Sequence, residues 1–167
     1  KLVALIEHMD SGIGRLMRTL DEQQLSKNTL VIFSSDNGGL LAEGANNGTW
    51  RSGKTHMYEG GLRVPAFARW PIRITPGTST QHVAVSMDIF ATCCAAAGVA
   101  AGSEVDGVSF LPTLTGQPQP TTARNLYFTR REGGPYLGKT IEALIAGEWK
   151  LVADTPTSPV ELFDLAK

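Results

Sequence analysis

The sequence predicts an α/β protein, with helices on a layered sheet followed by a small antiparallel subdomain. Two observations predict the layered part: an amphipathic helical pattern opens the chain, and a continuous apolar run follows at 29–34. A helix followed by a buried strand is typical of such a sheet. Beyond residue 119 the pattern changes to short strands, two of them joined through Gly147 and Glu148 alone, which is typical of an antiparallel hairpin. We therefore divide the chain into 1–119, part of an α/β domain, and 120–167, the antiparallel subdomain.

The first element is expected to be a helix of about six turns with one apolar side. Thr29 to Ser34 then forms an apolar run, which is typical of a strand covered on both faces, usually in a parallel sheet. Ligands of layered sheets bind beyond the carboxyl ends of the strands, and the stretch FSSDNGG at 33–39 lies at that end. The apolar positions of the helix recur at three- and four-residue steps: Leu2, Leu5, Met9, Ile13, Leu16 and Leu20.

The later elements follow from turn residues and from periodicity. A strand is expected over 62–70, a helix over 87–97 that Gly98 ends, and a short helical turn or loop over 106–116. The short strands of the C-terminal subdomain are expected to begin at Leu126, Ile141 and Trp149.

Two cysteines, Cys93 and Cys94, are adjacent in an alanine-rich helical stretch. Neighbouring cysteines rarely bridge each other, and no CxxC or histidine spacing accompanies them. We therefore expect both to be small buried side chains.

Composition excludes some classes of partner. The chain has 167 residues, 42% of them hydrophobic, and a formal net charge of −1, so no broad positive surface for nucleic acid is expected. No apolar stretch reaches the roughly 20 residues of a membrane-spanning helix. The chain opens inside a helical pattern and stops soon after a strand-like run, so we expect it to be cut at both ends from a longer protein.

The long polar loop at 35–61 is the first candidate site. It exceeds the length of a plain connection, which indicates a functional or a disordered segment. Asp36 and Asn37 offer a carboxylate and an amide oxygen, the hard ligands that Ca²⁺ or Mg²⁺ prefers. Two ligands do not complete such a site, and Asp, Asn and Gly are also the usual residues of a simple turn. Both interpretations stay open on these residues alone.

A second cluster of charged residues lies within the same glycine-rich stretch. Lys54 stands between Gly53 and Thr55, where its ammonium could meet a phosphate or sulfate oxygen, although a solvated surface lysine is the commoner case. His56 is a candidate for substrate binding, with a packed or exposed loop histidine as the more frequent alternative. Glu59 and Arg63, four residues apart, are expected to form an ion pair that fixes the loop.

Four stretches of the chain together resemble the type I sulfatases, the formylglycine-dependent family within the alkaline phosphatase superfamily. They are VIFSSDNGG, RSGKTHMYEGGLRVPAFARWP, VSMDIFATCCAAAG and DGVSFLPTLTG. The resemblance covers essentially the whole chain, and the order of SDNG and GK-x-x-x-x-EGG-x-R-x-P is specific. It implies part of an alkaline phosphatase-like layered sheet, and it implies that this chain is the C-terminal portion of a sulfatase.

The resemblance also implies roles for the loop residues. Asp36 and Asn37 would ligate Ca²⁺, and Lys54 would bind the sulfate group and stabilise the charge that develops during hydrolysis. Apart from the resemblance, we expect His56, two residues after Lys54, to take part in substrate binding. The nucleophile of the family, a formylglycine made from a cysteine or serine, has no counterpart here and is expected before residue 1. Ser52 stands where the family commonly has glycine.

The implied activity is hydrolysis of a sulfate ester to an alcohol and sulfate, on a small-molecule or glycan substrate. A phosphomonoester or phosphonate hydrolase of the same superfamily is the nearest alternative, and an inert fragment that self-associates through exposed sheet edges is the other. Arg130, Arg131 and Tyr136 are conceivable contacts for an anionic sugar, or else a solvated charged loop. The compartment is not readable from these residues; the resemblance implies a periplasmic, secreted or lysosomal protein.

Overall fold

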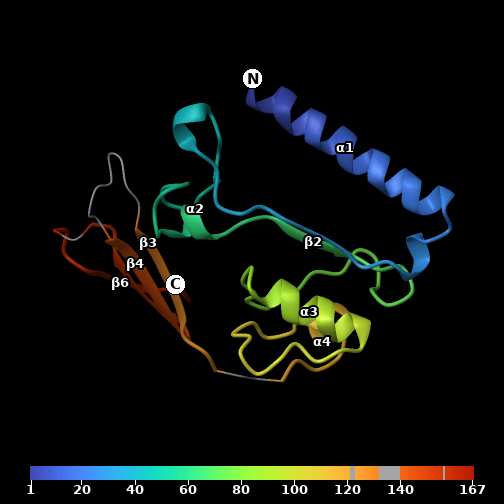
Figure 1. Cartoon of the computed structure of the whole chain (residues 1–167). Helices are drawn as coiled ribbons and strands as arrows, with labels where there is room; N and C mark the ends of the chain where they lie inside the picture. The colour runs from blue at the N-terminus through green and yellow to red at the C-terminus, as the bar shows by residue number, and fades with distance from the viewer. Residues whose placement is uncertain (121–122, 132–139, 156) are drawn as a thin grey trace. The chain divides into compact units, whose positions relative to one another are not determined.

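The computed structural model describes residues 1–120, 123–131, 140–155 and 157–167, and the chain forms two compact units (Figure 1). The first unit consists of Lys1–Ser34 and Ala66–Pro120, and the second of Ser35–Pro65 and Thr121–Lys167. The long loop between the first two strands therefore packs with the C-terminal strands. Within the described ranges, no helix is both long and apolar enough to cross a bilayer.

The first unit begins with the predicted amphipathic helix, α1 (Leu2–Glu22). None of its residues is buried, and its apolar side chains Leu5 and Leu16 are 62% and 53% exposed. The apolar stripe is thus present as predicted but lies open. The unit continues with η1 (Ser26–Asn28), β1 (Val31–Ser34), β2 (Ala66–Arg69), α3 (Asp88–Ala97) and α4 (Leu111–Leu114).

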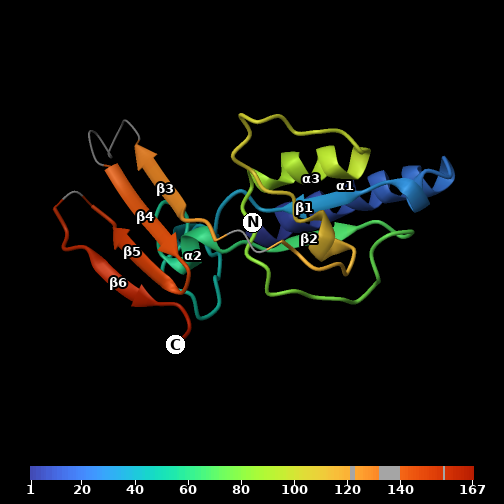
Figure 2. The ribbon, with the colours of Figure 1, turned by 90° about the horizontal axis from the view of Figure 1, so that it is seen from below.

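The expectation of a parallel strand at 29–34 is wrong. Strand β1 pairs antiparallel with β2, so that Val31 lies opposite Arg69 and Ser34 opposite Ala66. The side chains of β1 are half-buried or exposed, not covered on both faces. An apolar run indicates how a strand can be covered but does not encode its direction. Here the chain leaves β1 into the long loop and returns beside it as β2 (Figure 2).

Helix α3 begins and ends close to where the sequence predicts. Gly98 adopts a left-handed backbone with φ of 72° at the helix end, a conformation that glycine adopts without steric cost. At its start, the fully buried carboxylate of Asp88 accepts hydrogen bonds from the backbone N–H of Val85 at 2.9 Å and of Val108 at 2.8 Å. This carboxylate ties the segment after the helix back to its first turn.

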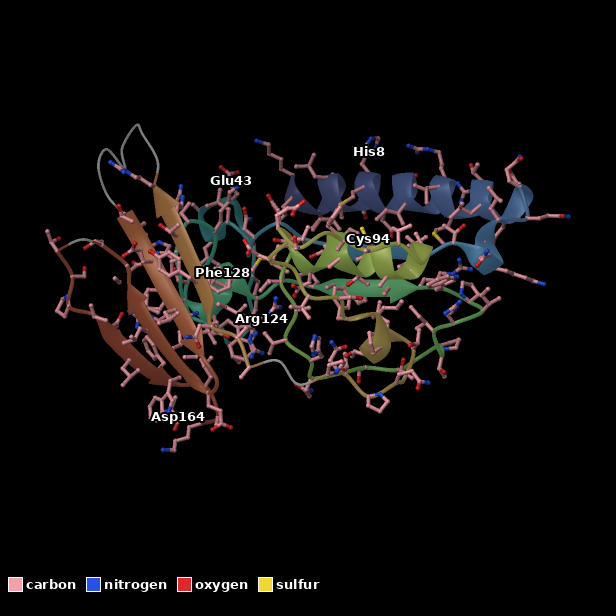
Figure 3. The ribbon with its side chains drawn as sticks, turned by 60° about the horizontal axis from the view of Figure 1, so that its bottom comes forward. His8, Glu43, Cys94, Arg124, Phe128 and Asp164 are labelled. Carbon is pink, nitrogen blue, oxygen red and sulfur yellow. The ribbon has the colours of Figure 1, made fainter. Side chains whose placement is uncertain are left out.

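The expectation that both cysteines are buried is wrong. The buried side of α3 consists of Asp88, Ala91 and Thr92. Cys93 is exposed and Cys94 is half-buried; Figure 3 labels Cys94 on α3. Both are free thiols. The helical period, not the apolar character of the stretch, decides which side chains face inward.

The second unit contains the predicted antiparallel strands. They form a four-stranded sheet in chain order, in which β4 and β5 are joined through Gly147 and Glu148, and Ala146 lies opposite Trp149. The predicted hairpin is therefore confirmed. The elements of this unit are η2 (Leu41–Glu43), α2 (Glu59–Leu62), β3 (Leu126–Arg131), β4 (Thr140–Ala146), β5 (Trp149–Ala153) and β6 (Glu161–Asp164).

One face of this sheet packs against the long loop. Met57 and Tyr58 from the loop form a buried cluster with residues of β4 and β5. Leu62, Phe128 on β3 and Phe163 on β6 pack around its margin; Figure 3 labels Phe128. Apolar burial of this kind is the main favourable term in packing, so the sheet anchors the loop. The sheet residues of the cluster are Ile141, Ala143 and Val152.

Candidate functional site

The candidate site lies in the loop between β1 and β2. Two arms of this loop, the turn at 35–39 and the segment at 51–56, meet at α2 through direct backbone contacts. Gly38 donates its N–H to the carbonyl of Gly61 at 2.9 Å, and Gly60 donates to the carbonyl of Arg51 at the same distance. A Cβ at Gly38 would lie 1.8 Å from the oxygen of Gly60, and one at Gly61 would lie 2.0 Å from that of His56. Because no side chain fits these approaches, the glycines are required by the close contact of the two arms.

A second set of hydrogen bonds joins Lys54 to the turn that contains Asp36 and Asn37, the predicted calcium ligands. Lys54 donates its backbone N–H to the carbonyl of Gly39 at 3.1 Å. The side chain of Asn47 reinforces this contact: its Oδ1 accepts from the N–H of Gly39 at 2.9 Å, and its Nδ2 donates to the carbonyl of Ser52 at 2.9 Å. The two motifs that the sequence places fifteen or more residues apart are therefore neighbours in the folded loop.

Asp36 and Asn37 occupy the turn directly after β1. Asp36 is exposed, and its Oδ1 accepts the N–H of Asn37 at 3.0 Å. The amide nitrogen of Asn37 donates to the carbonyl of Gly38 at 2.9 Å, which leaves the amide oxygen as the atom able to meet a cation. The donor chemistry therefore fits two of the oxygen ligands of Ca²⁺. No cluster of three or more His, Cys, Asp and Glu residues suited to a metal occurs in the described ranges.

Lys54 is exposed and lies between two residues with an unusual backbone. Ser52 and Thr55 have φ of 65° and 85°, the left-handed region that a β-branched residue such as threonine seldom adopts. Such a conformation costs on the order of 1–3 kcal/mol and persists only where neighbouring contacts impose it. One of these contacts is the hydrogen bond from Arg130 Nη1 to the carbonyl of Thr55 at 3.0 Å. The lysine ammonium has no ion-pair partner among the residues that the structure describes.

His56 is held by the carboxylate of the residue directly after β5. Its Nδ1 lies 2.9 Å from Oδ2 of Asp154, and its ring stacks on Tyr58 with 6.4 Å between the centroids. The side chain of His56 remains 44% exposed. These contacts match the structural alternative, a packed loop histidine, and leave the exposed part of the ring available for a ligand.

Glu59 and Arg63 form the predicted ion pair, with 2.6 Å between Nε of Arg63 and Oε2 of Glu59. The other oxygen of Glu59 lies 2.6 Å from Nζ of Lys150, a lysine of β5 that is only 1% exposed. Burial by itself would raise the pKa of Glu59, but the hydrogen bonds and charges of Lys150 and then Arg63 outweigh it and lower that pKa. Glu59 therefore stays ionised and joins α2 to the sheet.

A second polar contact joins the loop to β6. Arg51 Nη1 lies 2.9 Å from Oε1 of Glu161, and the hydroxyl of Tyr58 donates to the other oxygen of the same carboxylate. The guanidinium of Arg51 also lies over the Tyr58 ring, 3.7 Å from its centroid, a favourable cation–π geometry. Burial, followed by the hydrogen bond to Glu161, raises the pKa of Tyr58 to about 12. Hydrogen bonds from Tyr58 and Arg51 lower the pKa of Glu161.

Sequence reasoning missed three of these partners. Lys150 carries a signal in retrospect, because a lysine at an inward position of an apolar strand needs a buried counter-charge. Asp154 and Glu161 carry no such signal. Of the conceivable sugar contacts, Arg130 serves the loop backbone, Arg131 is exposed, and Tyr136 lies outside the described residues.

The fold and the loop together define an α/β protein of the alkaline phosphatase-like class. The predicted fold class is confirmed by solved structures, among them Ps i-CgsB in complex with k-i-k-neocarrahexaose, which matches 94% of this chain with a TM-score of 0.79 and 32% identity. The model of the Sulfatase family matches residues 2–99. The chain belongs to the sulfatase family, as the SDNG and GK-x-x-x-x-EGG motifs predict.

Curated relatives support the same assignment. N-acetylgalactosamine-6-sulfatase of Canis lupus familiaris is 34% identical over 164 residues, which are 95% of this chain and 30% of that protein. Steryl-sulfatase of Mus musculus is 38% identical over 124 residues, 68% of this chain and 20% of that protein. The chain thus spans about a third or less of the length of these relatives, and 34% of the solved Ps i-CgsB chain.

Proposed function

We propose that this chain supplies the calcium-binding and sulfate-binding residues of an enzyme that hydrolyses a sulfate ester to an alcohol and sulfate. The observation that carries the proposal is the hydrogen bond from Lys54 N–H to the carbonyl of Gly39. It brings the exposed lysine next to the turn that contains Asp36 and Asn37. Membership of the sulfatase family supports the choice of sulfate as the anion.

In this proposal, Asp36 and Asn37 hold Ca²⁺ through their side-chain oxygens, and the bound cation supplies positive charge opposite the sulfate group. Lys54 places its ammonium on a sulfate oxygen and stabilises the negative charge that grows as the ester bond breaks. His56, two residues away and fixed by Asp154, contacts the remainder of the substrate. The formylglycine nucleophile is expected in sequence that precedes residue 1, with 1–119 belonging to its catalytic domain.

For the substrate, a carbohydrate sulfate ester is the proposed class. Two matched proteins carry carbohydrate names: one is an N-acetylgalactosamine-6-sulfatase, and the other was solved with k-i-k-neocarrahexaose bound.

The test uses the complete reading frame that contains this chain. The active-site peptide is analysed by mass spectrometry for formylglycine, and turnover is measured on 4-nitrophenyl sulfate and 4-nitrophenyl phosphate. Lys54→Ala is expected to lower kcat for the sulfate ester about 100-fold or more, the range for loss of one charge-stabilising donor. Lys27→Ala removes an exposed lysine of η1 and serves as the matched control.

Two results would contradict the proposal. Near-normal sulfate turnover by Lys54→Ala would remove the catalytic role of the lysine. An unmodified serine or threonine nucleophile together with preference for the phosphate ester would favour the phosphomonoester hydrolase instead.

A further inference from the structure

We propose that Lys150, buried in β5, is a positioning residue for the loop between β1 and β2, which contains Lys54. It acts through Glu59. The C-terminal sheet would then set the positions of Lys54 and of the turn that contains Asp36 and Asn37, in addition to stabilising the protein. This inference rests on the proposed function, because it concerns the same loop. Lys150 itself touches no substrate in this scheme.

The first observation is the burial of the ion pair. Lys150 is 1% exposed, and its Nζ lies 2.6 Å from Oε1 of Glu59. Taking an ammonium out of water is costly, and a buried ion pair often contributes less stability than apolar side chains of the same size. Such a pair can instead impose one arrangement of the elements that it joins. Here the elements are β5 and α2.

The second observation is the position of α2 within the loop. Directly after Glu59, the N–H of Gly60 donates to the carbonyl of Arg51, and the carbonyl of Gly61 accepts from Gly38, both at 2.9 Å. The α-carbons are so close to their neighbours that a Cβ at Gly60 would lie 2.2 Å from the oxygen of Ser52. A shift of α2 is therefore transmitted to both arms, because close-packed backbone has no space to absorb it.

The third observation is the asymmetry between the two cations on Glu59. Arg63 binds Oε2 from within four residues, is 54% exposed, and belongs to the same loop. Lys150 lies 91 residues away in sequence and comes from the sheet. Without Lys150, Glu59 keeps its local partner but no longer connects α2 to β5. Lys150→Met removes the charge and retains the unbranched apolar stem.

The experiment measures amide hydrogen exchange at residue resolution in the complete protein that contains this chain. In Lys150→Met, the amides of Gly38 and Lys54 are expected to exchange at least about tenfold faster, because their acceptors Gly61 and Gly39 lose their fixed position. Amides in the β3–β4 pairing should change much less. The control Ile141→Ala opens a cavity in the same core and should accelerate exchange across the whole unit.

Glu59→Gln provides a second variant that keeps the size of the side chain. It should give the same local pattern with a smaller amplitude, and the double variant should exceed Lys150→Met only slightly, because both changes remove one connection. Uniform acceleration in Lys150→Met and in Glu59→Gln alike, with Gly38 and Lys54 no more affected than β3–β4, would overturn the inference.

Turnover separates this inference from the proposed function. In the complete enzyme, well below its unfolding temperature, Lys150→Met should lower kcat for 4-nitrophenyl sulfate about tenfold, whereas Ile141→Ala should leave kcat close to normal. If Lys54→Ala abolishes turnover but Lys150→Met behaves like Ile141→Ala, the positioning role is wrong and the proposed function stands. If Lys54→Ala keeps turnover, the proposed function fails, and the exchange pattern alone decides whether Lys150 positions the loop.

Discussion

Replacing Gly38 by alanine tests whether the contact between the metal turn and α2 is as close as described. The new Cβ would lie 1.8 Å from the oxygen of Gly60 and 2.8 Å from its carbonyl carbon. Both are backbone atoms, so relief requires the turn and α2 to separate by more than about 1 Å, which also breaks the hydrogen bond from Gly38 to Gly61. Overpacking costs roughly 1–3 kcal/mol, and leaving buried backbone groups unpaired costs about 1–3 kcal/mol more. We therefore expect a loss of about 3 kcal/mol.

The assay is urea unfolding of the second unit, followed by the amide signals of β4 and β5. With a typical dependence on urea of about 1–3 kcal/mol per M, a loss of about 3 kcal/mol lowers the midpoint by roughly 1–3 M. Gly44→Ala is the matched control in the same loop: it has φ of 85° but nothing within 4 Å of the added Cβ, so only the left-handed strain of about 1 kcal/mol is expected. Equal midpoints for the two variants would refute the close contact.

Three further predictions concern single side chains of the loop. Burial and the hydrogen bond to Glu161 raise the pKa of Tyr58 to about 12 from its ordinary 10.0, so the stability it contributes is fully present below pH 10 and is lost as pH rises toward 12. Ultraviolet titration should show one phenol that ionises at a higher pH than the others, and this step should be absent in Tyr58→Phe. If the step persists in that variant, the assignment to Tyr58 is wrong. The pKa of Glu59 is lowered from 4.5, because its hydrogen bonds to Lys150 and Arg63 outweigh the effect of burial. Its contribution to the free energy of unfolding is therefore present above pH 4.5 and is lost as pH falls below that value. In Glu59→Gln the free energy of unfolding should fall less steeply with decreasing pH in this range, and an unchanged pH dependence would argue against the pairing. Ser52→Gly relieves a φ of 65° and should stabilise the second unit by about 0.5–1 kcal/mol in urea, whereas a lower midpoint would show that the serine side chain itself contributes.

The parts of the fold that local pattern governs could be predicted from the sequence. Helix α1 follows from its apolar period, α3 from its apolar run and the glycine at 98, and the β4–β5 hairpin from a two-residue connection. Each depends on neighbours within a few residues, which the sequence displays directly.

Direction and partnership could not be predicted in the same way. The antiparallel course of β1 depends on β2, more than thirty residues later, and the inward face of α3 depends on which segment covers it. Lys54 and Asp36 could be proposed as site residues because their motifs are local. Lys150 and Glu161 were not, because their partners lie 91 and 103 residues away, and nothing in the intervening sequence specifies the pairing.

The separation of these contacts has a consequence for biosynthesis. Because the N-terminal end of the chain leaves the ribosome first, the segment 35–65 emerges long before its anchors. These are Lys150 in β5, Asp154 directly after β5, and Glu161 in β6. Contacts of such long range form late in folding. During translation the segment 35–65 therefore stays unsupported, exposed to proteases and chaperones, until β5 and β6 have left the exit tunnel. A premature stop before residue 150 would release a chain with both loop motifs intact but without Lys150, Asp154 and Glu161 to hold them.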